Sequence, residues 1–121
     1  GDFDKAMIKL VKRYKVLEDS YAWNLAMDEC NKTMVFSHGN LLFVFNWHPT
    51  ASIPDYELPV QAPGKYVPVL STDERRFGGQ QRQAMDAEHF SFPARDGDNT
   101  ERPHIRIYNT SRTATVYLRK K

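Results

Sequence analysis

Residues 33–45, TMVFSHGNLLFVF, decide the fold class of this chain of 121 residues. Aromatic and β-branched residues, which strands favour, occupy both ends of the stretch. The residues between them, SHGN, include the glycine and asparagine typical of a tight hairpin turn. We therefore predict two antiparallel strands joined by this turn. The second, residues 41–45, is apolar at every position, so we expect a second sheet to cover one of its faces and a helix or neighbouring domain to cover the other.

From Thr33 onward the period of the sequence changes to two and β-forming residues dominate. Strands are predicted for residues 33–36, 41–47, 56–60, 66–70, 104–109 and 113–118. Residues 62–65, APGK, form a Pro-Gly turn between two of them, and residues 78–79 and 95–99 mark longer loops. Short strands separated by turns at this spacing predict an all-β fold, an antiparallel β-sandwich with a helical lead-in.

The helical lead-in covers residues 3–14. Apolar residues at helical spacing form its apolar side, namely Phe3, Met7, Leu10, Val11 and Tyr14. Asp2 or Asp4 can cap its start. Residues 17–30 do not hold one period, and we interpret them as an irregular connector with room for one more helical turn. The predicted division is therefore a helix and connector in residues 1–30, followed by an all-β domain in residues 31–121.

Composition excludes several classes of partner. The 17 basic and 15 acidic residues are interspersed and sum to a net charge of +2, so nucleic-acid binding is not expected. No apolar run approaches the roughly 20 residues that span a bilayer, so no membrane partner is expected. The single cysteine, Cys30, cannot form an internal disulfide, which favours a reducing compartment such as the cytoplasm. Because the sequence begins at Gly1, we expect it to be part of a longer protein.

Residues that could carry catalysis or bind a metal form no recognisable constellation. The four histidines lack an HxxxH pair or a cysteine partner; they are His38, His48, His89 and His104. No serine stands in a GxSxG context, and any carboxylate pair is at the background level of a chain of this size. We therefore predict no catalytic residue, no metal ligand and no cofactor.

Several short motifs occur in an order that resembles one known domain. Residues 43–50, FVFNWHPT, with Asp55-Tyr56 shortly after, resemble the C-terminal domain of glucan branching enzymes of the α-amylase superfamily. The other motifs that resemble this family are residues 3–7, 12–14, 63–66, 69–73, 77–79 with Arg82, 111–114 and 116–117. Trp47 stands where phenylalanine is usual, and Gln80-Gln81 follow the double glycine where a smaller or aromatic pair is common.

The resemblance implies a parent enzyme that cleaves an α-1,4 glucan linkage and reattaches the segment through an α-1,6 bond. Its carboxylates would lie on a (β/α)8 barrel of about 250 residues, which this chain lacks, so we expect the chain alone to be inactive. Residues 1–30 would then be the last barrel helix and a connector. The barrel of the same parent chain is the expected partner, in the cytoplasm or, in a plant, the plastid.

Two roles remain open for the β domain within that family. It can pack on the barrel and help to orient the glucan, or it can bind α-glucan directly through Trp47, His48 and Tyr56, which offer aromatic rings and hydrogen bonds. Outside the family, the alternative is a stand-alone carbohydrate-binding or protein-interaction β-sandwich. A docking domain should expose a flat apolar patch, whereas a binding module should expose a few rings rimmed by polar groups.

Overall fold

The computed structural model describes residues 2–13 and 22–120. Our expectations for residues 14–21, and for the side chains of Leu10, Val11 and Trp23, lie outside the described part. The elements are α1 (Asp2–Arg13), β1 (Ala22–Asp28), β2 (Thr33–His38), β3 (Leu41–Asn46), β4 (Ile53–Pro59), β5 (Lys65–Ser71), the 3-10 helix η2 (Arg75–Phe77), β6 (His89–Phe90), β7 (Phe92–Arg95), β8 (Glu101–Asn109) and β9 (Thr113–Lys120).

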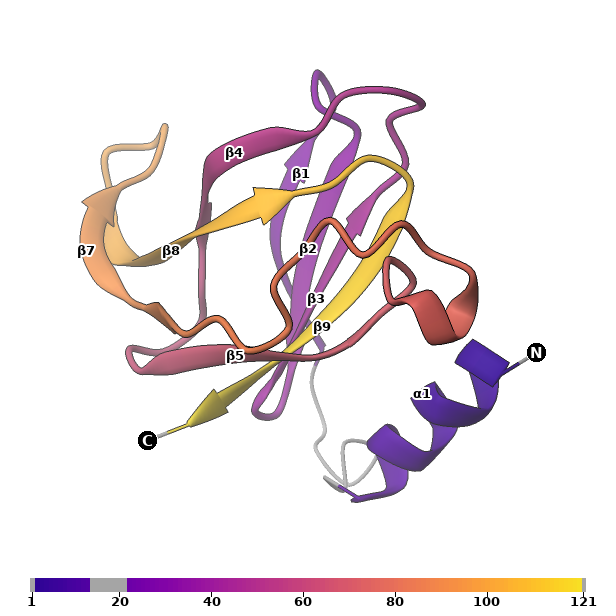
Figure 1. Cartoon of the computed structure of the whole chain (residues 1–121). Coiled ribbons are helices and arrows are strands. Elements are labelled where there is room, and N and C mark those ends of the chain that lie inside the picture. The colour runs from indigo at the N-terminus through magenta and orange to yellow at the C-terminus, as the bar shows by residue number, and fades with distance from the viewer. Residues whose placement is uncertain (1, 14–21, 121) are drawn as a thin grey trace.

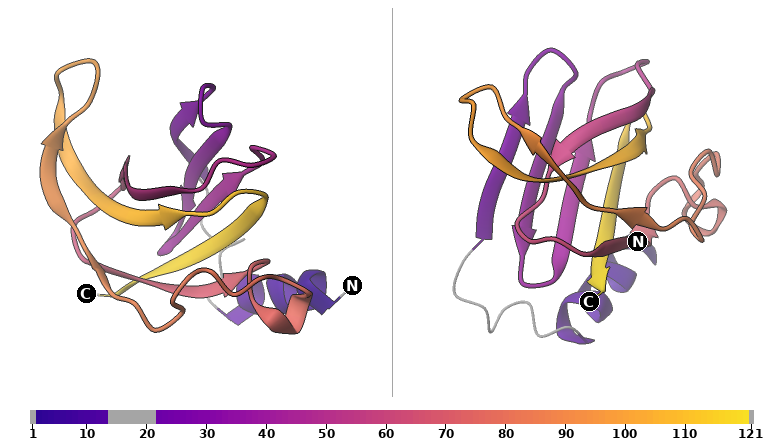
Figure 2. Two further views of the ribbon diagram at one scale, coloured as in Figure 1. Left: turned by 45° about the horizontal axis from the view of Figure 1, so that its top comes forward. Right: turned by 90° about the vertical axis from the view of Figure 1, so that its left-hand side faces the viewer.

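The strands form two antiparallel sheets, and the predicted β-sandwich is confirmed (Figure 1). The larger sheet has the order β1-β2-β3-β9-β5-β6, and the smaller sheet has the order β4-β8-β7. The smaller sheet curves over one face of the larger one, while α1 lies on the other side (Figure 2). Each of the six predicted strands overlaps an observed strand. These strands were predictable because a two-residue repeat of side-chain character and β-forming residues are strong local signals.

The prediction of an irregular connector was wrong over residues 22–28. These residues form β1, which pairs with β2 from Ala22↔His38 to Asp28↔Thr33. The register shifts between Asn24 and Ala26, and this bulge interrupts the alternation by which a strand is recognised in a sequence. The short strands β6 and β7 were also missed, the second because Pro93 is unusual inside a strand.

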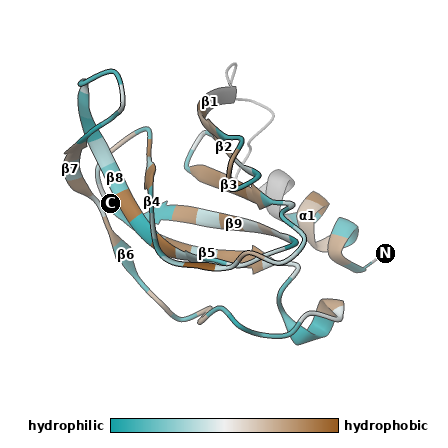
Figure 3. Cartoon of the chain, turned by 90° about the horizontal axis from the view of Figure 1, so that it is seen from above, coloured by the Kyte–Doolittle hydropathy of each residue, from teal (hydrophilic) through white to brown (hydrophobic). Residues whose placement is uncertain are grey.

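Alternate residues of β3 face two different cores. Leu42 and Val44 belong to the inner cluster between the sheets, with Val35, Leu58, Val60, Tyr66, Ile105, Ile107 and Tyr117. Leu41 and Phe43 belong to an outer cluster with Leu70 and Val116, against which Phe3, Ala6 and Met7 of α1 pack. The prediction that residues 41–45 need cover on both sides is confirmed, since a sheet covers one face and a helix the other. Figure 3 shows the apolar residues of α1 and of the strands beside it in brown.

A polar clamp holds the long segment between η2 and β6 against the sandwich. The carboxylate of Asp73, whose side chain is 1% exposed, accepts a bond of 2.9 Å from Nε of Arg82 and one of 2.8 Å from the backbone N–H of Gln83. Arg82 also donates to the hydroxyl and the carbonyl of Ser111. Gln83 in turn bridges the sheets, because its Oε1 accepts from Ser71 Oγ and its Nε2 donates to the carbonyl of Tyr108.

Candidate functional site

A strip of partly exposed apolar side chains lies on the outer face of the larger sheet, next to the outer cluster on which α1 packs. It consists of Met27, Met34, Phe45 and Trp47, and we call it the outer strip. The register pairs Met27 with Met34 and Met34 with Phe45, and cross-strand partners share one face of a sheet. Met27 is 56% exposed and Trp47 is 49% exposed. Large apolar side chains with this exposure in a contiguous group are typical of an interaction surface.

A shallow groove of about 590 Å³ runs along the outer strip. The apolar residues that line it are Met34, Phe45, Trp47 and Ala114, and the polar ones are Asn46, Thr72, Arg112 and Thr113. Phe45 also stacks on Phe36 at a ring separation of 5.6 Å, which joins the outer strip to the outer cluster beneath α1. The surface of the groove is therefore mostly apolar.

The predicted sugar-binding residues occupy different surroundings. The backbone N–H of Trp47 donates to the carbonyl of Lys32, and its indole belongs to the outer strip. The ring of His48 stabilises a turn, since its Nδ1 accepts bonds of 3.1 Å and 2.9 Å from the backbone N–H groups of Thr50 and Ala51. That nitrogen is thus already used by the chain itself.

Tyr56 lies on the other side of the larger sheet. Its half-buried ring packs against the inner cluster, and its hydroxyl donates a bond of 2.7 Å to Oδ2 of Asp28 on β1. Burial opposes ionisation of Asp28, but hydrogen bonds from Asn31 and Tyr56 outweigh it and lower the pKa of this carboxyl. Burial and the same carboxylate raise the pKa of Tyr56. Over the described residues, no hydrogen bond joins Trp47, His48 and Tyr56 to one another.

One buried histidine is already used by hydrogen bonds within the fold. His104, whose side chain is 4% exposed, contacts Oδ1 of Asp96 at 2.8 Å and the carbonyl of Arg102 at 2.8 Å. Residues 2–13 and 22–120 hold no group of three or more His, Cys, Asp or Glu side chains that could bind a metal ion. Within the same ranges, no helix has the length and apolar character needed to cross a membrane.

Sequence reasoning found Trp47 but missed the three other members of the outer strip. Met34 and Phe45 were predicted only as strand residues, and Met27 was assigned to the connector. The signal that could have revealed the strip is that Met27, Met34 and Phe45 are cross-strand neighbours on one face of the sheet. This signal can be recognised only when the strand register is known.

The fold and the surface define an accessory domain, an antiparallel β-sandwich that carries a helix and a partly exposed apolar strip on one face. The family model described as alpha amylase, C-terminal all-beta domain matches residues 23–120, and the chain belongs to this family. The match begins within β1, which agrees with the place of that strand in the larger sheet.

Curated relatives are consistent with this family. The chain is 39% identical to 1,4-alpha-glucan-branching enzyme 2-2, chloroplastic/amyloplastic, of Arabidopsis thaliana. The 117 aligned residues make up 96% of this chain and 14% of that protein. The chain is 36% identical over 120 residues to the 1,4-alpha-glucan-branching enzyme of Saccharomyces cerevisiae, covering 99% of this chain and 17% of the relative. The Dictyostelium discoideum enzyme is 35% identical over 116 residues, with coverage of 95% and 17%. The chain thus spans only a small part of these relatives, and the predicted resemblance is confirmed.

Proposed function

We propose that this chain is the C-terminal domain of a 1,4-α-glucan-branching enzyme and that it packs on the catalytic barrel of the same parent through the outer face of its larger sheet. The observation that carries the proposal is the outer strip, which continues from the outer cluster beneath α1 across β3, β2 and β1. Similarity over nearly the whole chain to branching enzymes supports the identity of the parent. We infer that such an enzyme acts in the cytoplasm, or in the plastid of a plant.

The helix α1 also supports the proposal that the outer face of the larger sheet is turned toward the barrel. Phe3, Ala6 and Met7 pack on the outer cluster, whereas Ile8 on another side of the helix is 55% exposed. A helix that is apolar on more than one side is suited to contact two bodies, here the sandwich and the barrel. α1 would thus be the last helix of the barrel, and the outer strip beside it would be covered by barrel elements next to that helix.

In this proposal the chemistry belongs to the barrel. The parent cleaves an α-1,4 linkage and forms an α-1,6 branch by a retaining double displacement, which requires a nucleophilic carboxylate and an acid/base carboxylate. In barrels of this type the catalytic groups lie at the carboxyl ends of the strands. This chain contributes surface and orientation, and by itself it is inactive.

Direct contact between glucan and Trp47 is the second candidate role. The half-exposed indole favours it, because sugar rings stack on exposed aromatic rings. The surroundings of the indole favour docking, since Met34, Phe45 and Ala114, which line the same groove, are apolar. A sugar platform normally has polar groups placed around the ring to bind the hydroxyls.

A chimeric enzyme tests the docking role. The segment of the Arabidopsis relative that matches this chain is replaced by residues 1–121, and branching is followed by the loss of amylose–iodine absorbance. The chimera should recover activity and thermal stability relative to the truncated enzyme, while the isolated chain shows no activity. Trp47→Asp in the chimera should lower both. Phe90→Asp is the matched control, because Phe90 is 66% exposed on β6 at the opposite edge of the sheet.

The two roles give different results in a second measurement. Direct sugar contact predicts saturable chemical-shift changes around Trp47 when maltooligosaccharides are added to the isolated chain, and their loss in Trp47→Ala. Docking predicts none there. A chimera no more active or stable than the truncated enzyme would contradict docking.

A further inference from the structure

A turn at one corner of the sandwich presents an arginine beside the groove. The chain leaves the smaller sheet at Asn109, where β8 ends, and enters the larger sheet at Thr113, where β9 begins. Thr110 and Ser111 between them are buried, whereas Arg112 is exposed. Arg112 is therefore the residue of this turn that is available to a partner.

The backbone on the near side of Arg112 is held firmly. The N–H of Ser111 donates a bond of 2.9 Å to Oγ of Ser52, and the guanidinium of Arg82 donates one of 2.9 Å to the carbonyl of Ser111. These bonds fix the direction in which the side chain of Arg112 leaves the chain. A group fixed in this way before binding loses less conformational freedom when a partner arrives.

Arg112 also has a strained backbone conformation. Its φ is 56°, in the left-handed region, where turns usually place glycine or asparagine. Holding a long side chain there costs stability, and such strain is typical of positions that serve a function. Nothing offsets this cost within the described part of the chain, because there the guanidinium makes no hydrogen bond and no ion pair.

Arg112 lines a polar hollow as well as the groove. The hollow has a volume of about 290 Å³, its surface is mostly polar, and it shares Thr72, Arg112 and Thr113 with the groove. Its charged lining residues are two arginines and one aspartate, and Asp73 is already paired with Arg82 at 2.9 Å. The charge that remains is that of Arg112, so the hollow favours an anionic group.

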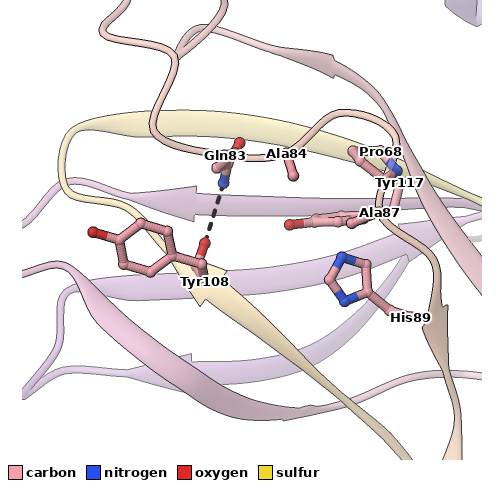
Figure 4. Close-up of a pocket in the computed structure, with 7 residues that line it drawn as sticks. All are labelled: Pro68, Gln83, Ala84, Ala87, His89, Tyr108 and Tyr117. Atoms are coloured by element: carbon pink, nitrogen blue, oxygen red, sulfur yellow. Dashed lines mark hydrogen bonds between the residues drawn. The ribbon is translucent and has the colours of Figure 1, made fainter.

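The small pocket between the two sheets gives no comparable signal. Its lining contains no Lys, Arg, Asp or Glu side chain, and its surface is almost entirely apolar (Figure 4). Charge therefore distinguishes the polar hollow from this pocket as a place for a specific partner.

Thr72 supplies a second donor where the groove meets the hollow. Its Oγ1 accepts a bond of 3.0 Å from the N–H of Ala114, and over residues 2–13 and 22–120 its hydroxyl hydrogen is donated to no acceptor. A hydroxyl can donate and accept at the same time, so this hydrogen is available. Arg112 has donors only, and the pair matches a carboxylate, which only accepts.

Docking of the outer strip would take Arg112 out of water. Trp47 and Arg112 line the same groove, so a barrel that covers the indole also covers the guanidinium. A charge buried without a partner is costly, and a carboxylate compensates a guanidinium best because it accepts two parallel N–H bonds. Since the described residues provide no such acceptor, it has to come from the surface that docks.

We propose that an Asp or Glu side chain on the surface of the barrel enters where the groove meets the polar hollow, accepting two bonds from the guanidinium of Arg112 and one from the hydroxyl of Thr72. The inference rests on the proposed docking. Apolar contacts along the outer strip permit several positions, whereas a two-bond ion pair has one geometry. Arg112 thus fixes the position of the domain on the barrel.

Variants of the chimera test this ion pair. Arg112→Met should lose branching activity at a raised temperature about ten times faster than the unsubstituted chimera, because losing one partner of a buried charge pair mainly accelerates separation of the two surfaces. Arg106→Met is the matched control. The side chain of Arg106 is 58% exposed on the smaller sheet, so its loss should leave the rate unchanged. Equal rates for Arg112→Met and the unsubstituted chimera overturn the proposal.

Arg112→Gly separates docking from folding. In the isolated chain, glycine relieves the left-handed conformation and no bond is lost, so the melting temperature should stay the same or rise. In the chimera the same substitution removes the ion pair and should lower the melting temperature. A lower melting temperature in the isolated chain would assign Arg112 to the fold and overturn the proposal.

A zero-length crosslink identifies the partner. Arg112→Lys places an amine at this position of the chimera, and a carbodiimide joins amines to carboxylates that touch them. Mass spectrometry should find an amide between residue 112 and an Asp or Glu outside residues 1–121. The ion pair of Lys65 and Glu88, 2.6 Å long, is the internal control. If this pair is crosslinked and residue 112 is not joined to the barrel, the proposal is overturned.

The failure of this inference differs from the failure of docking. A chimera no more active or stable than the truncated enzyme contradicts docking itself. A chimera that recovers both properties and is unaffected by Arg112→Met contradicts the ion pair alone.

Discussion

Replacing Arg82 with methionine should cost about 3 kcal/mol of unfolding free energy. The guanidinium bonds Asp73 Oδ1 at 2.9 Å and the carbonyl of Ser111 at 2.9 Å, and the side chain of Asp73 is only 1% exposed. Removing one partner of a buried ion pair typically costs about 3 to 5 kcal/mol, because the other charge stays buried. The lower end applies here, since Arg82 is 25% exposed and Gln83 still donates its N–H to the carboxylate.

Urea unfolding followed by tryptophan fluorescence measures this loss, and an unchanged slope would show that the compactness of the folded and unfolded states is the same. In a chain of this size the melting temperature should fall by about 12 °C. Arg76→Met is the matched control from the same segment: its bond to Glu74 is 3.1 Å long but its side chain is 57% exposed, so it should cost less than about 1 kcal/mol.

The double variant Asp73→Asn/Arg82→Met gives a further check. It removes the charge that the single variant leaves buried, so it should be more stable than Arg82→Met alone. If Arg82→Met costs no more than Arg76→Met, the clamp does not stabilise the fold and the reasoning is refuted.

Two further predictions concern the clamp and the link between the sheets. Gly79→Ala should lose about 2 to 3 kcal/mol in the same urea assay, since a Cβ there would collide with the backbone of Thr72 and Asp73; a neutral result would mean that this segment moves freely. Tyr56→Phe should lose about 1 kcal/mol at neutral pH. Folding lowers the pKa of Asp28, so its ionised carboxylate stabilises the folded state above the ordinary pKa of 3.8, and this stabilisation is lost as the pH falls below that value. The difference in unfolding free energy between wild type and Tyr56→Phe should therefore shrink in acid. A difference that grows in acid would contradict this assignment.

Local patterns predicted most of the strands and failed where hydrogen bonding to neighbours outweighed them. Residues 113–118 are rich in β-branched and aromatic residues and were found, whereas β1 has a register shift between Asn24 and Ala26 and was taken for a connector. Pairing with β2 stabilises β1 in spite of its mixed residues. β7 contains Pro93 and lies at the edge of its sheet, where a missing backbone donor is tolerated.

The candidate surfaces were predictable only in part. The exposure of Trp47 was anticipated, but its neighbours Met27 and Met34 were not. Tyr56 was expected to offer a stacking ring, and its hydroxyl instead bonds Asp28, which lies 28 residues away in the chain. Neither the left-handed conformation of Arg112 nor its place beside the groove leaves a signal in the sequence, because most arginines lie exposed on the surface.

The sequence by itself determined the all-β class, the hairpin at residues 33–45, the N-terminal helix, the double cover that β3 needs and the likeness to branching enzymes. These features depend on period, turn residues and linear motifs, which are local. Only the tertiary structure decided that Met27, Met34 and Phe45 share one face, that Asp73 and Arg82 clamp the long segment, and that Arg112 lines both the groove and the polar hollow. The physical reason is that strand register and sheet packing place residues side by side that are far apart in the chain, and both are set by the whole set of contacts together.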